Sequence, residues 1–185
     1  MVSQNEQTSR IRVRDKVFRL YLSKEKIDDI VSVIAGSIDR DYEGKTPLLL
    51  GILNGAFIFA SDLMRKLQVT GEISFVKYSS YHGLDSSGKV SSLIGLNEEI
   101  KGRDVIIVED IVDTGCTMAK LLEDLKQFRP ASVRIACFCF KKDAFRENFR
   151  IDYCGIVIPK LFVVGYGLDY NGSGRNFPDI YQLDE

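Results

Sequence analysis

The residues best suited to chemistry lie in one short segment, VIIVEDIVDTGCT, from Val105 to Thr117. An apolar run leads into two adjacent acids, Glu109 and Asp110, and a third acid, Asp113, precedes Thr-Gly-Cys-Thr. Two adjacent carboxylates could accept hydrogen bonds from the vicinal hydroxyls of a ribose, or could share a Mg²⁺ ion. The hydroxyls and backbone N–H groups that follow could hold one phosphate. The segment therefore predicts a site for a phosphorylated ribose.

The second half of this segment has the features of a phosphate cradle. Thr114 and Thr117 bring hydroxyl donors, Gly115 allows the backbone to approach a ligand closely, and Cys116 lies at the expected start of a helix. In open parallel sheets, ligands bind beyond the carboxyl ends of the strands. We therefore expect the 113–117 stretch to hold a phosphate at such a strand end.

The same segment allows other interpretations. Glu109 and Asp110 could be ordinary acids at a strand end, with Asp113 as a helix cap. The Asp-Thr-Gly triplet also occurs in aspartic proteases, but that fold is all-β and needs a second carboxylate, which here only a homodimer could supply. The dinucleotide and Walker phosphate fingerprints are absent from the sequence. A phosphorylated ribose fits the ordered spacing best.

A sheet and helices must position these residues, and the sequence predicts both. Apolar residues recur at helical spacing from about 24 to 40 behind Ser23, a candidate N-cap, and the run from Pro47 to Leu53 is typical of a strand buried on both faces. Alternating strands and helices predict an α/β fold with a parallel core sheet. The further expected elements are helices over about 56–67 and 117–128 and strands over 73–77, 105–108, 133–140 and 156–158.

One connection stands out by its length. Between Tyr78 and Leu96 the chain is rich in Ser and Gly and has no strong periodicity. Long loops of this kind are usually functional or flexible. We expect an active-site lid here, with a plain flexible hairpin as the alternative, and we assign no catalytic role to His82 within it.

Composition excludes several classes of protein. The 185 residues fit one domain, and 25 Lys and Arg against 26 Asp and Glu give a net charge of -1, which argues against a broad nucleic-acid surface. No export signal and no apolar run of the ~20 residues that span a bilayer occur, so we expect a cytoplasmic protein without membrane contact. Four cysteines without a C-x-x-C pair and one histidine predict reduced, mostly buried thiols rather than zinc or disulfides.

Several segments resemble the type I phosphoribosyltransferases, specifically their hypoxanthine-guanine branch. The resemblance covers about residues 47 to 185, and FVVGYGLDY is typical of the 6-oxopurine enzymes. It implies the family's fold: one domain of residues 1–185 with a parallel core sheet flanked by helices, and a small hood from about 1–22 and 160–185, including KVFRLYL and DIYQLDE. The matching segments are VIIVEDIVDTGCTM (the phosphoribosyl-diphosphate signature), LGILNGAFIFASDL (the first loop), SSYH (the start of the lid), CFCFKK (the purine-contacting strand end) and PKLFVVGYGLDYNGSGR (the base-stacking and metal-binding region).

The resemblance implies a purine salvage activity. The family transfers 5-phosphoribosyl from 5-phosphoribosyl 1-diphosphate (PRPP) to hypoxanthine or guanine, which yields IMP or GMP and pyrophosphate, with Mg²⁺ as cofactor. By resemblance, Glu109 and Asp110 bind the ribose diol with Mg²⁺ nearby, and Asp113 is the general base on the purine imidazole nitrogen. The 113–117 stretch, including Cys116, holds the 5′-phosphate. The family usually forms homodimers or homotetramers.

The resemblance also assigns the purine contacts. Lys141 would donate to the exocyclic O6, Phe162 would stack on the ring, and the backbone of Val163 would meet the base edge. Asp169 would lie at this end of the site as the second magnesium carboxylate. The alternatives are a solvated lysine at a strand end for Lys141, and two ordinary core residues for Phe162 and Val163.

At the pyrophosphate, the resemblance assigns Arg175, Asn54 and Gly55, and it assigns the lid contacts to Ser80 and Tyr81. Many relatives carry Lys or Arg where this chain has Asn54, and the peptide bond entering that position is often cis. Loss of a cation there leads us to expect weaker PRPP affinity than in an Asn54→Lys variant.

Three further alternatives stay open at the level of the sequence. The enzyme could prefer xanthine or another base. The chain could be a nucleotide-sensing regulator on the same fold that binds RNA, although the balanced charge and the presence of Asp113 argue against this. Cys116, at a helix N-terminus, could be a reactive thiol that PRPP shields, or an inert small side chain.

Overall fold

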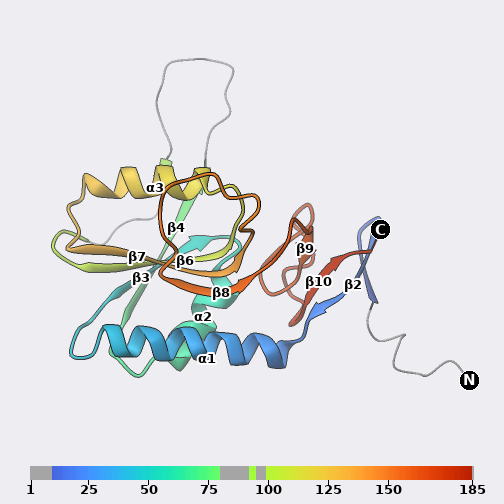
Figure 1. Ribbon diagram of the computed structural model, residues 1–185, viewed down its shortest axis with the longest axis horizontal. Helices are drawn as coiled ribbons and strands as arrows, with labels where there is room; N and C mark the ends of the chain where they lie inside the picture. The colour runs from blue at the N-terminus through green and yellow to red at the C-terminus, as the bar shows by residue number, and fades with distance from the viewer. Residues whose placement is uncertain (1–9, 80–91, 95–98, 185) are drawn as a thin grey trace, which may run out of the picture.

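The computed structural model describes residues 10–79, 92–94 and 99–184 of the chain (Figure 1). Its strands and helices alternate through most of the sequence, as the apolar periodicity predicts. In chain order they are β1 (Arg10–Val13), β2 (Lys16–Leu22), α1 (Lys24–Asp41), β3 (Leu48–Leu53), α2 (Phe57–Lys66), β4 (Glu72–Ser79), β5 (Ser92–Ile94), β6 (Asp104–Val112), α3 (Cys116–Lys126), β7 (Ser132–Phe140), β8 (Tyr153–Val157), β9 (Val163–Val164) and β10 (Ile180–Leu183).

The larger sheet has the strand order β5-β4-β3-β6-β7-β8. Strands β4, β3, β6, β7 and β8 pair in parallel, whereas β5 pairs antiparallel with β4 at one edge. The central strands are apolar on both faces, since helices cover both. The predicted α/β class with a parallel core sheet is confirmed, and the short edge strand β5 is an addition that the sequence does not reveal.

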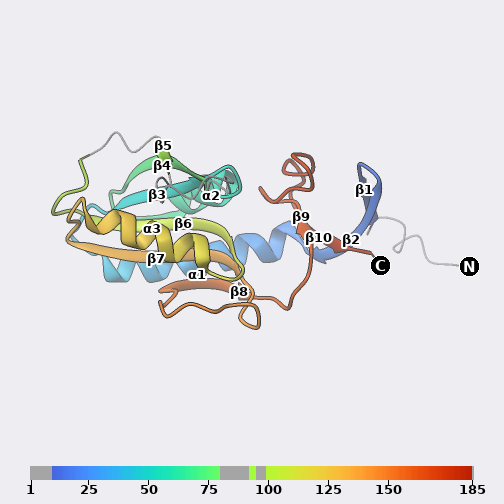
Figure 2. The same cartoon turned by 90° about the horizontal axis from the view of Figure 1, so that it is seen from above.

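Helices α1 and α2 cover one face of this sheet, and α3 covers the other (Figures 1 and 2). Ile27, Val31, Ile34 and Ile38 of α1 are buried at helical spacing and belong to one core cluster. Fully burying one such side chain contributes roughly 1.5–3 kcal/mol. Ser23 precedes α1 as expected, but its side chain makes no capping hydrogen bond. Within the described ranges, no helix is both long enough and apolar enough to cross a membrane.

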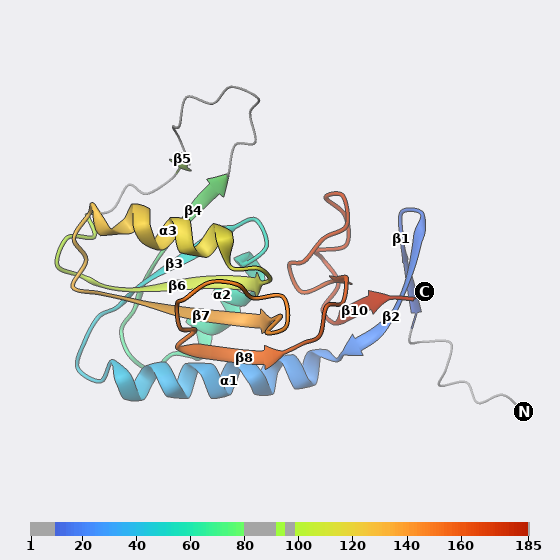
Figure 3. The same ribbon diagram turned by 45° about the horizontal axis from the view of Figure 1, so that its top comes forward.

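A smaller antiparallel sheet with the order β1-β2-β10-β9 combines segments from both ends of the chain. It lies beyond the arrowheads of β6, β7 and β8 (Figure 3). Phe18 and Val164 are fully buried in its core. The carboxyl ends of the parallel strands therefore face this second sheet, which we call the hood. The division of the chain into one domain with a hood of about 1–22 and 160–185 stays a prediction.

Strand β6 corrects one expectation. The sequence predicts a strand that stops at Val108, before the acids, but β6 continues through Glu109 and Asp110 to Val112. Its register with β7 pairs Glu109 with Cys137 and Ile111 with Cys139. The two acids thus lie on a regular strand, so the sheet, rather than a loop, fixes their backbone.

The cysteines correct another expectation in part. All four are free thiols, as predicted, and Cys137 and Cys139 are buried in β7. Cys116 and Cys154, however, are exposed. Cys154 lies on the edge strand β8, and Cys116 is the first residue of α3, which explains why burial does not extend to them.

Candidate active site

The phosphate loop connects β6 to α3 and encloses a small cavity. Gly115, the residue before the helix, has φ of 89°, a left-handed conformation that glycine adopts without strain. The cavity measures about 140 Å³, and Glu109, Asp113, Thr114 and Thr117 contribute to its lining. Hydroxyls and the N–H groups of a helix start thus surround a space suited to one phosphate. Cys116 is adjacent to it but does not line it.

An aromatic group supports this loop from outside. Phe145 packs edge-to-face on Phe140 and Phe149, with ring centroids 5.2 Å and 4.9 Å away. A Cβ atom on Gly115 would come within 2.6 Å of the Phe145 ring. The Arg146 backbone N–H also donates to the Thr114 carbonyl at 3.0 Å. The segment after β7 therefore holds the phosphate loop in place.

The acid pair of β6 consists of a buried Asp110 and a partly buried Glu109. Asp110 is 9% exposed, and its Oδ1 accepts a hydrogen bond from the Ile111 N–H at 2.8 Å. Burial, followed by the charge of Asp110, raises the pKa of Glu109 well above its usual range. Burial also raises the pKa of Asp110, although the charge of Arg175 opposes that rise. A cation or a developing positive charge nearby would favour the ionised form of both acids.

Asp110 connects the strand to the first loop. A Cβ atom on Gly55 would lie 1.7 Å from the Asp110 Oδ2, and one on Gly167 would lie 2.1 Å from the Gly55 carbonyl oxygen. The Leu53–Asn54 peptide bond is cis, as the resemblance implies, and Asn54 is exposed. Three distant segments can approach one another only because both contact positions are glycines.

Arg175 and Asp169 lie together at this end of the site. The Arg175 Nη2 is 2.6 Å from the Asp169 Oδ1, and its Nη1 donates to the Gly167 carbonyl at 2.6 Å. The other Asp169 oxygen accepts the Gly172 N–H at 2.6 Å. Both side chains are about a quarter exposed, at 25% and 28%. A guanidinium in this arrangement retains donors for a polyanion, because its planar fork carries five N–H groups.

A second cavity, of about 440 Å³, adjoins the phosphate loop on the other side. Asp113, Lys141 and Phe162 line it, as do Arg146 and Lys160. The Lys141 Nζ is 2.7 Å from the Asp113 Oδ2, and the lysine side chain is only 14% exposed. This lysine is therefore not solvated, in contrast to that alternative. Phe162 is 46% exposed, so a ring face is accessible for stacking.

Val163 reconciles two interpretations that the sequence leaves open. Its side chain is 6% exposed and belongs to the core. Its backbone, however, lies on β9, the edge strand of the hood. The Leu183 N–H donates to the Phe162 carbonyl. Since hydrogen-bonded and non-bonded pairs alternate in an antiparallel ladder, the N–H and C=O of Val163 point to the open edge.

The predicted lid residues lie outside the described residues; they are Ser80, Tyr81 and His82. The choice between a lid and a plain hairpin therefore stays open.

Among the residues that the structure does describe, no three His, Cys, Asp or Glu side chains form a metal-binding group. Mg²⁺ usually takes only one or two carboxylates and completes its shell with water and substrate phosphates. The acid pair supplies two carboxylates and Asp169 supplies one, so each fits that role by its chemistry.

Sequence reasoning missed several residues of the site. Arg146 and Lys160 line the larger cavity, and Phe145 supports the phosphate loop. The run KKDAFR after β7 was a usable signal, since basic residues gather just beyond a strand end. The contact between Gly55 and Gly167 left no such signal, because it depends on tertiary packing.

Comparisons with known proteins agree with this geometry. The family model for the phosphoribosyl transferase domain matches residues 21–171. The hypoxanthine-guanine phosphoribosyltransferase of Aquifex aeolicus is 35% identical over 94% of this chain and 98% of its own. The enzyme of that name from Lactococcus lactis is 40% identical over 88% of both chains. A crystal structure of a Bacillus anthracis hypoxanthine-guanine phosphoribosyltransferase superimposes with a TM-score of 0.84 at 31% identity, over 92% of this chain and 99% of that one. The chain therefore belongs to the phosphoribosyltransferase family.

Proposed function

We propose that this protein is a purine salvage transferase that converts PRPP and hypoxanthine or guanine into IMP or GMP and pyrophosphate. One observation carries the proposal: the phosphate cavity and the larger cavity share Asp113 and Thr114. A 5′-phosphate in the first and a purine in the second would meet across Asp113. The relatives named above carry the same activity in their names, at 35–40% identity over most of the chain.

Asp113 is the general base of this proposal. A C–N bond forms between the purine and C1′ of the ribose while the C1′–O bond to pyrophosphate breaks, and the electron pair leaves with pyrophosphate. The imidazole proton of the purine passes to the Asp113 carboxylate. This carboxylate is half exposed toward the larger cavity and pairs with Lys141 at 2.7 Å, so it is within reach of a bound base.

The acid pair acts on the sugar. Departure of pyrophosphate leaves positive charge on the ribose, and carboxylates beside the ring stabilise that charge. On β6, Asp110 is buried and Glu109 is partly buried, so water screens their charges less than it would at the surface. Mg²⁺ when bound stabilises the negative charge of the leaving pyrophosphate. The acid pair would hold Mg²⁺, Asp169 would be the second magnesium carboxylate, and Arg175 would bind the pyrophosphate.

Lys141 selects the base. An ammonium group donates to the O6 carbonyl of hypoxanthine or guanine, whereas the amino group of adenine offers it no acceptor. In the described structure Lys141 pairs with Asp113 at 2.7 Å. A bound purine would replace this ion pair, with its O6 accepting from Lys141 and its imidazole N–H donating to Asp113. Phe162 would stack on the ring, and the outward backbone groups of Val163 would meet its edge. A cytoplasmic location and a homodimer or homotetramer complete the proposal.

Xanthine is a second candidate substrate for a specific reason. The larger cavity is lined by Arg146 and Lys160 in addition to Lys141, against the single carboxylate of Asp113. Excess positive charge favours a base with a further carbonyl group over one with an amino group. We therefore test xanthine as a substrate in the same assay.

Separate incubation of the protein, Mg²⁺ and PRPP with hypoxanthine, guanine, xanthine and adenine tests the proposal. We expect nucleotide products from hypoxanthine and guanine and none from adenine, as measured by product chromatography. Nucleotide from xanthine alone would move the assignment to the second candidate. Absence of product with every 6-oxopurine would refute the proposed function.

A further inference from the structure

Tyr166 occupies an unusual position between the hood and the core. Its φ is 50°, and the flanking Gly165 and Gly167 both have φ of 96°. A side chain in the left-handed region costs about 1–3 kcal/mol and persists only where surrounding contacts fix it. A Cβ atom on Gly165 would lie 2.0 Å from the Asp179 carbonyl oxygen, so the backbone here is confined on both sides. The turn therefore needs an anchor.

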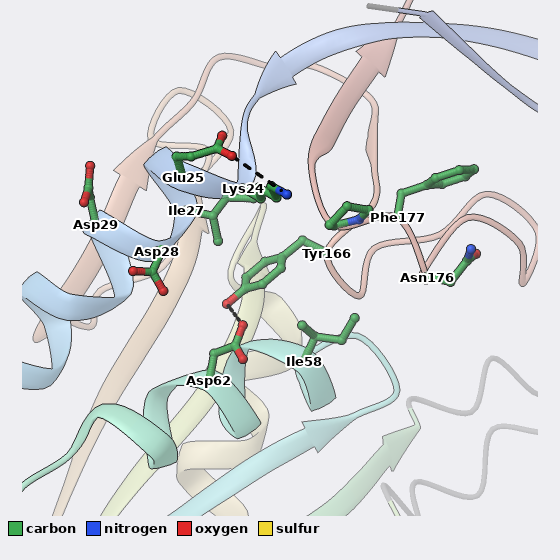
Figure 4. Close-up of a pocket in the computed structure, with 11 residues that line it drawn as sticks. Lys24, Glu25, Ile27, Asp28, Asp29, Ile58, Asp62, Tyr166, Asn176 and Phe177 are labelled. Carbon is green, nitrogen blue, oxygen red and sulfur yellow. Dashed lines mark hydrogen bonds and ion pairs between the residues drawn. The ribbon is translucent and has the colours of Figure 1, made fainter. Parts of the chain in front are cut away.

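The anchor is the Tyr166 side chain. Its ring packs on Phe138 with centroids 5.0 Å apart, and Phe138 in turn packs edge-to-face on Phe59 of α2. Its hydroxyl donates to the Asp62 Oδ2 of the same helix at 3.1 Å (Figure 4). Tyr166 is only 4% exposed. The turn is thus tied to β7 by one ring contact and to α2 by one hydrogen bond to a carboxylate.

Gly167, the residue after Tyr166, contacts Arg175, which we assign to pyrophosphate binding. Gly167 accepts a hydrogen bond from the Arg175 Nη1 at 2.6 Å and donates its N–H to the Arg175 carbonyl at 3.0 Å. It also lies against the Gly55 carbonyl oxygen. A displacement of Tyr166 would therefore move Arg175 and the first loop together.

Neither partner of the anchor reaches the substrate cavities. Tyr166 and Asp62 line a different cavity of about 660 Å³, between α1, α2 and the C-terminal loop, together with Asp28 and Ile58 (Figure 4). They line neither the phosphate cavity nor the purine cavity. Any effect on substrate must therefore pass through the backbone.

We propose that the hydrogen bond from Tyr166 to Asp62 positions Arg175, and thereby sets the affinity for PRPP and pyrophosphate but not for the purine. This inference rests on the proposed function for its link to PRPP. Tyr166 and Asp62 are positioning residues: Arg175 makes the contact, and the pair holds the carbonyl that orients it.

The matched variant is Tyr166→Phe, which keeps the ring packing and removes only the donor. We expect the KM for PRPP and the Kd for inorganic pyrophosphate with Mg²⁺ to rise about tenfold, because hydrogen bonds to charged groups are the stronger kind. The KM for hypoxanthine should stay within about twofold, since the purine cavity is untouched. Asp62→Ala should have the same effect as Tyr166→Phe, and the double variant should be no weaker than either single one.

Tyr181→Phe is the control. Tyr181 also donates to a carboxylate, that of Asp179, at the same 3.1 Å, and it is 7% exposed. It makes no hydrogen bond to Gly167 or Arg175, so its variant should bind pyrophosphate as the wild type does.

Asp62→Asn retains an acceptor oxygen and should restore most of the affinity that Asp62→Ala loses. If Tyr166→Phe does not fold, the two Asp62 variants carry the test.

Calorimetric titration with pyrophosphate and Mg²⁺ decides the matter independently of turnover. An unchanged pyrophosphate Kd in Tyr166→Phe, or an equal loss in Tyr181→Phe, would overturn the inference. A parallel rise of the hypoxanthine KM would do the same. If the wild type makes no nucleotide, the proposed function fails, while the pyrophosphate titration still decides the role of this pair.

Discussion

The two ends of the candidate site are built in different ways. The proposed 5′-phosphate end is one continuous stretch, from Asp113 to Thr117, that joins β6 to the first turn of α3. The pyrophosphate end joins three segments that are distant in the sequence, at Gly55, Asp110 and the Gly167–Arg175 loop. A continuous site depends mainly on local conformation, whereas a discontinuous one depends on how whole elements pack.

The glycines of the two ends show the consequence. At Gly115, an added Cβ would meet the edge of the Phe145 ring, a side chain that can shift. At Gly167 it would meet the Gly55 carbonyl, which is backbone, and at Gly55 it would meet the Asp110 carboxylate. We therefore expect the pyrophosphate end to tolerate substitution less well than the phosphate end.

The largest effect is expected at Asp113, which belongs to both cavities. Asp113→Asn removes the proposed general base and should lower kcat for hypoxanthine about 10²- to 10⁴-fold. Binding of pyrophosphate should change by less than about twofold, because the contacts of Arg175 are intact. Steady-state kinetics and pyrophosphate titration measure both. A kcat near that of the wild type would remove Asp113 from the chemistry.

The next effect separates the two ends. Gly167→Ala forces a Cβ against the Gly55 carbonyl, and we expect it to destabilise the fold by about 1–3 kcal/mol and to raise the PRPP KM more than about tenfold. Gly172→Ala is the matched control, since Gly172 also has positive φ, of 80°, but no heavy atom within 4 Å of an added Cβ. If Gly167→Ala and Gly172→Ala bind PRPP equally well, then PRPP binding does not depend on the contact between Gly167 and Gly55. Denaturant unfolding and initial rates measure the outcome.

The acid pair between the two ends predicts a pH dependence. Because burial raises the pKa of Glu109 in the folded state, the native protein keeps a proton that the unfolded chain has lost. Its contribution to stability is present below the unfolded pKa and is lost as pH rises through the folded pKa. Glu109→Gln should therefore gain stability relative to the wild type as pH rises above about 5 in metal-free buffer. Denaturant unfolding measures this, and a difference in unfolding free energy between Glu109→Gln and the wild type that does not change with pH would contradict the prediction.

The smallest effect is expected at the exposed Asn54. Asn54→Lys adds a cation beside the cis peptide bond at the pyrophosphate end. Exposed charges contribute at most about 1 kcal/mol, so we expect the PRPP KM to fall about threefold. Initial rates at varied PRPP measure the change. An unchanged or higher KM would show that this loop does not contact pyrophosphate through its side chain.

The same contrast explains how much the sequence could reveal. The phosphate loop was predictable because strand, glycine and helix start follow one another in the chain, and Lys141 was predictable from its strand end by resemblance. The length of β6 was not, because acids normally end a strand, whereas here the interior strand β6 continues through both acids toward the carboxyl ends of the parallel strands. The roles of Gly167 and Tyr166 depend on contacts with α2 and the first loop, which no local pattern encodes.

Val163 shows a third case, in which two predictions were compatible. The apolar run LFVVGY suggested a core residue, and the resemblance suggested a backbone contact to the base. In a β-strand the side chain and the backbone polar groups point in different directions, so one residue can serve both purposes. Only the position of β9 at the sheet edge reveals that its backbone faces outward.

We propose that one end of the site holds the phosphoribosyl group while it passes to the purine, and that the other end binds the pyrophosphate that leaves. Simultaneous measurement of IMP and pyrophosphate during turnover of PRPP with hypoxanthine and Mg²⁺ tests it most directly. We predict that the two products appear in equal amounts and that neither forms when hypoxanthine is omitted. Pyrophosphate release without IMP, or no release at all, would contradict the account.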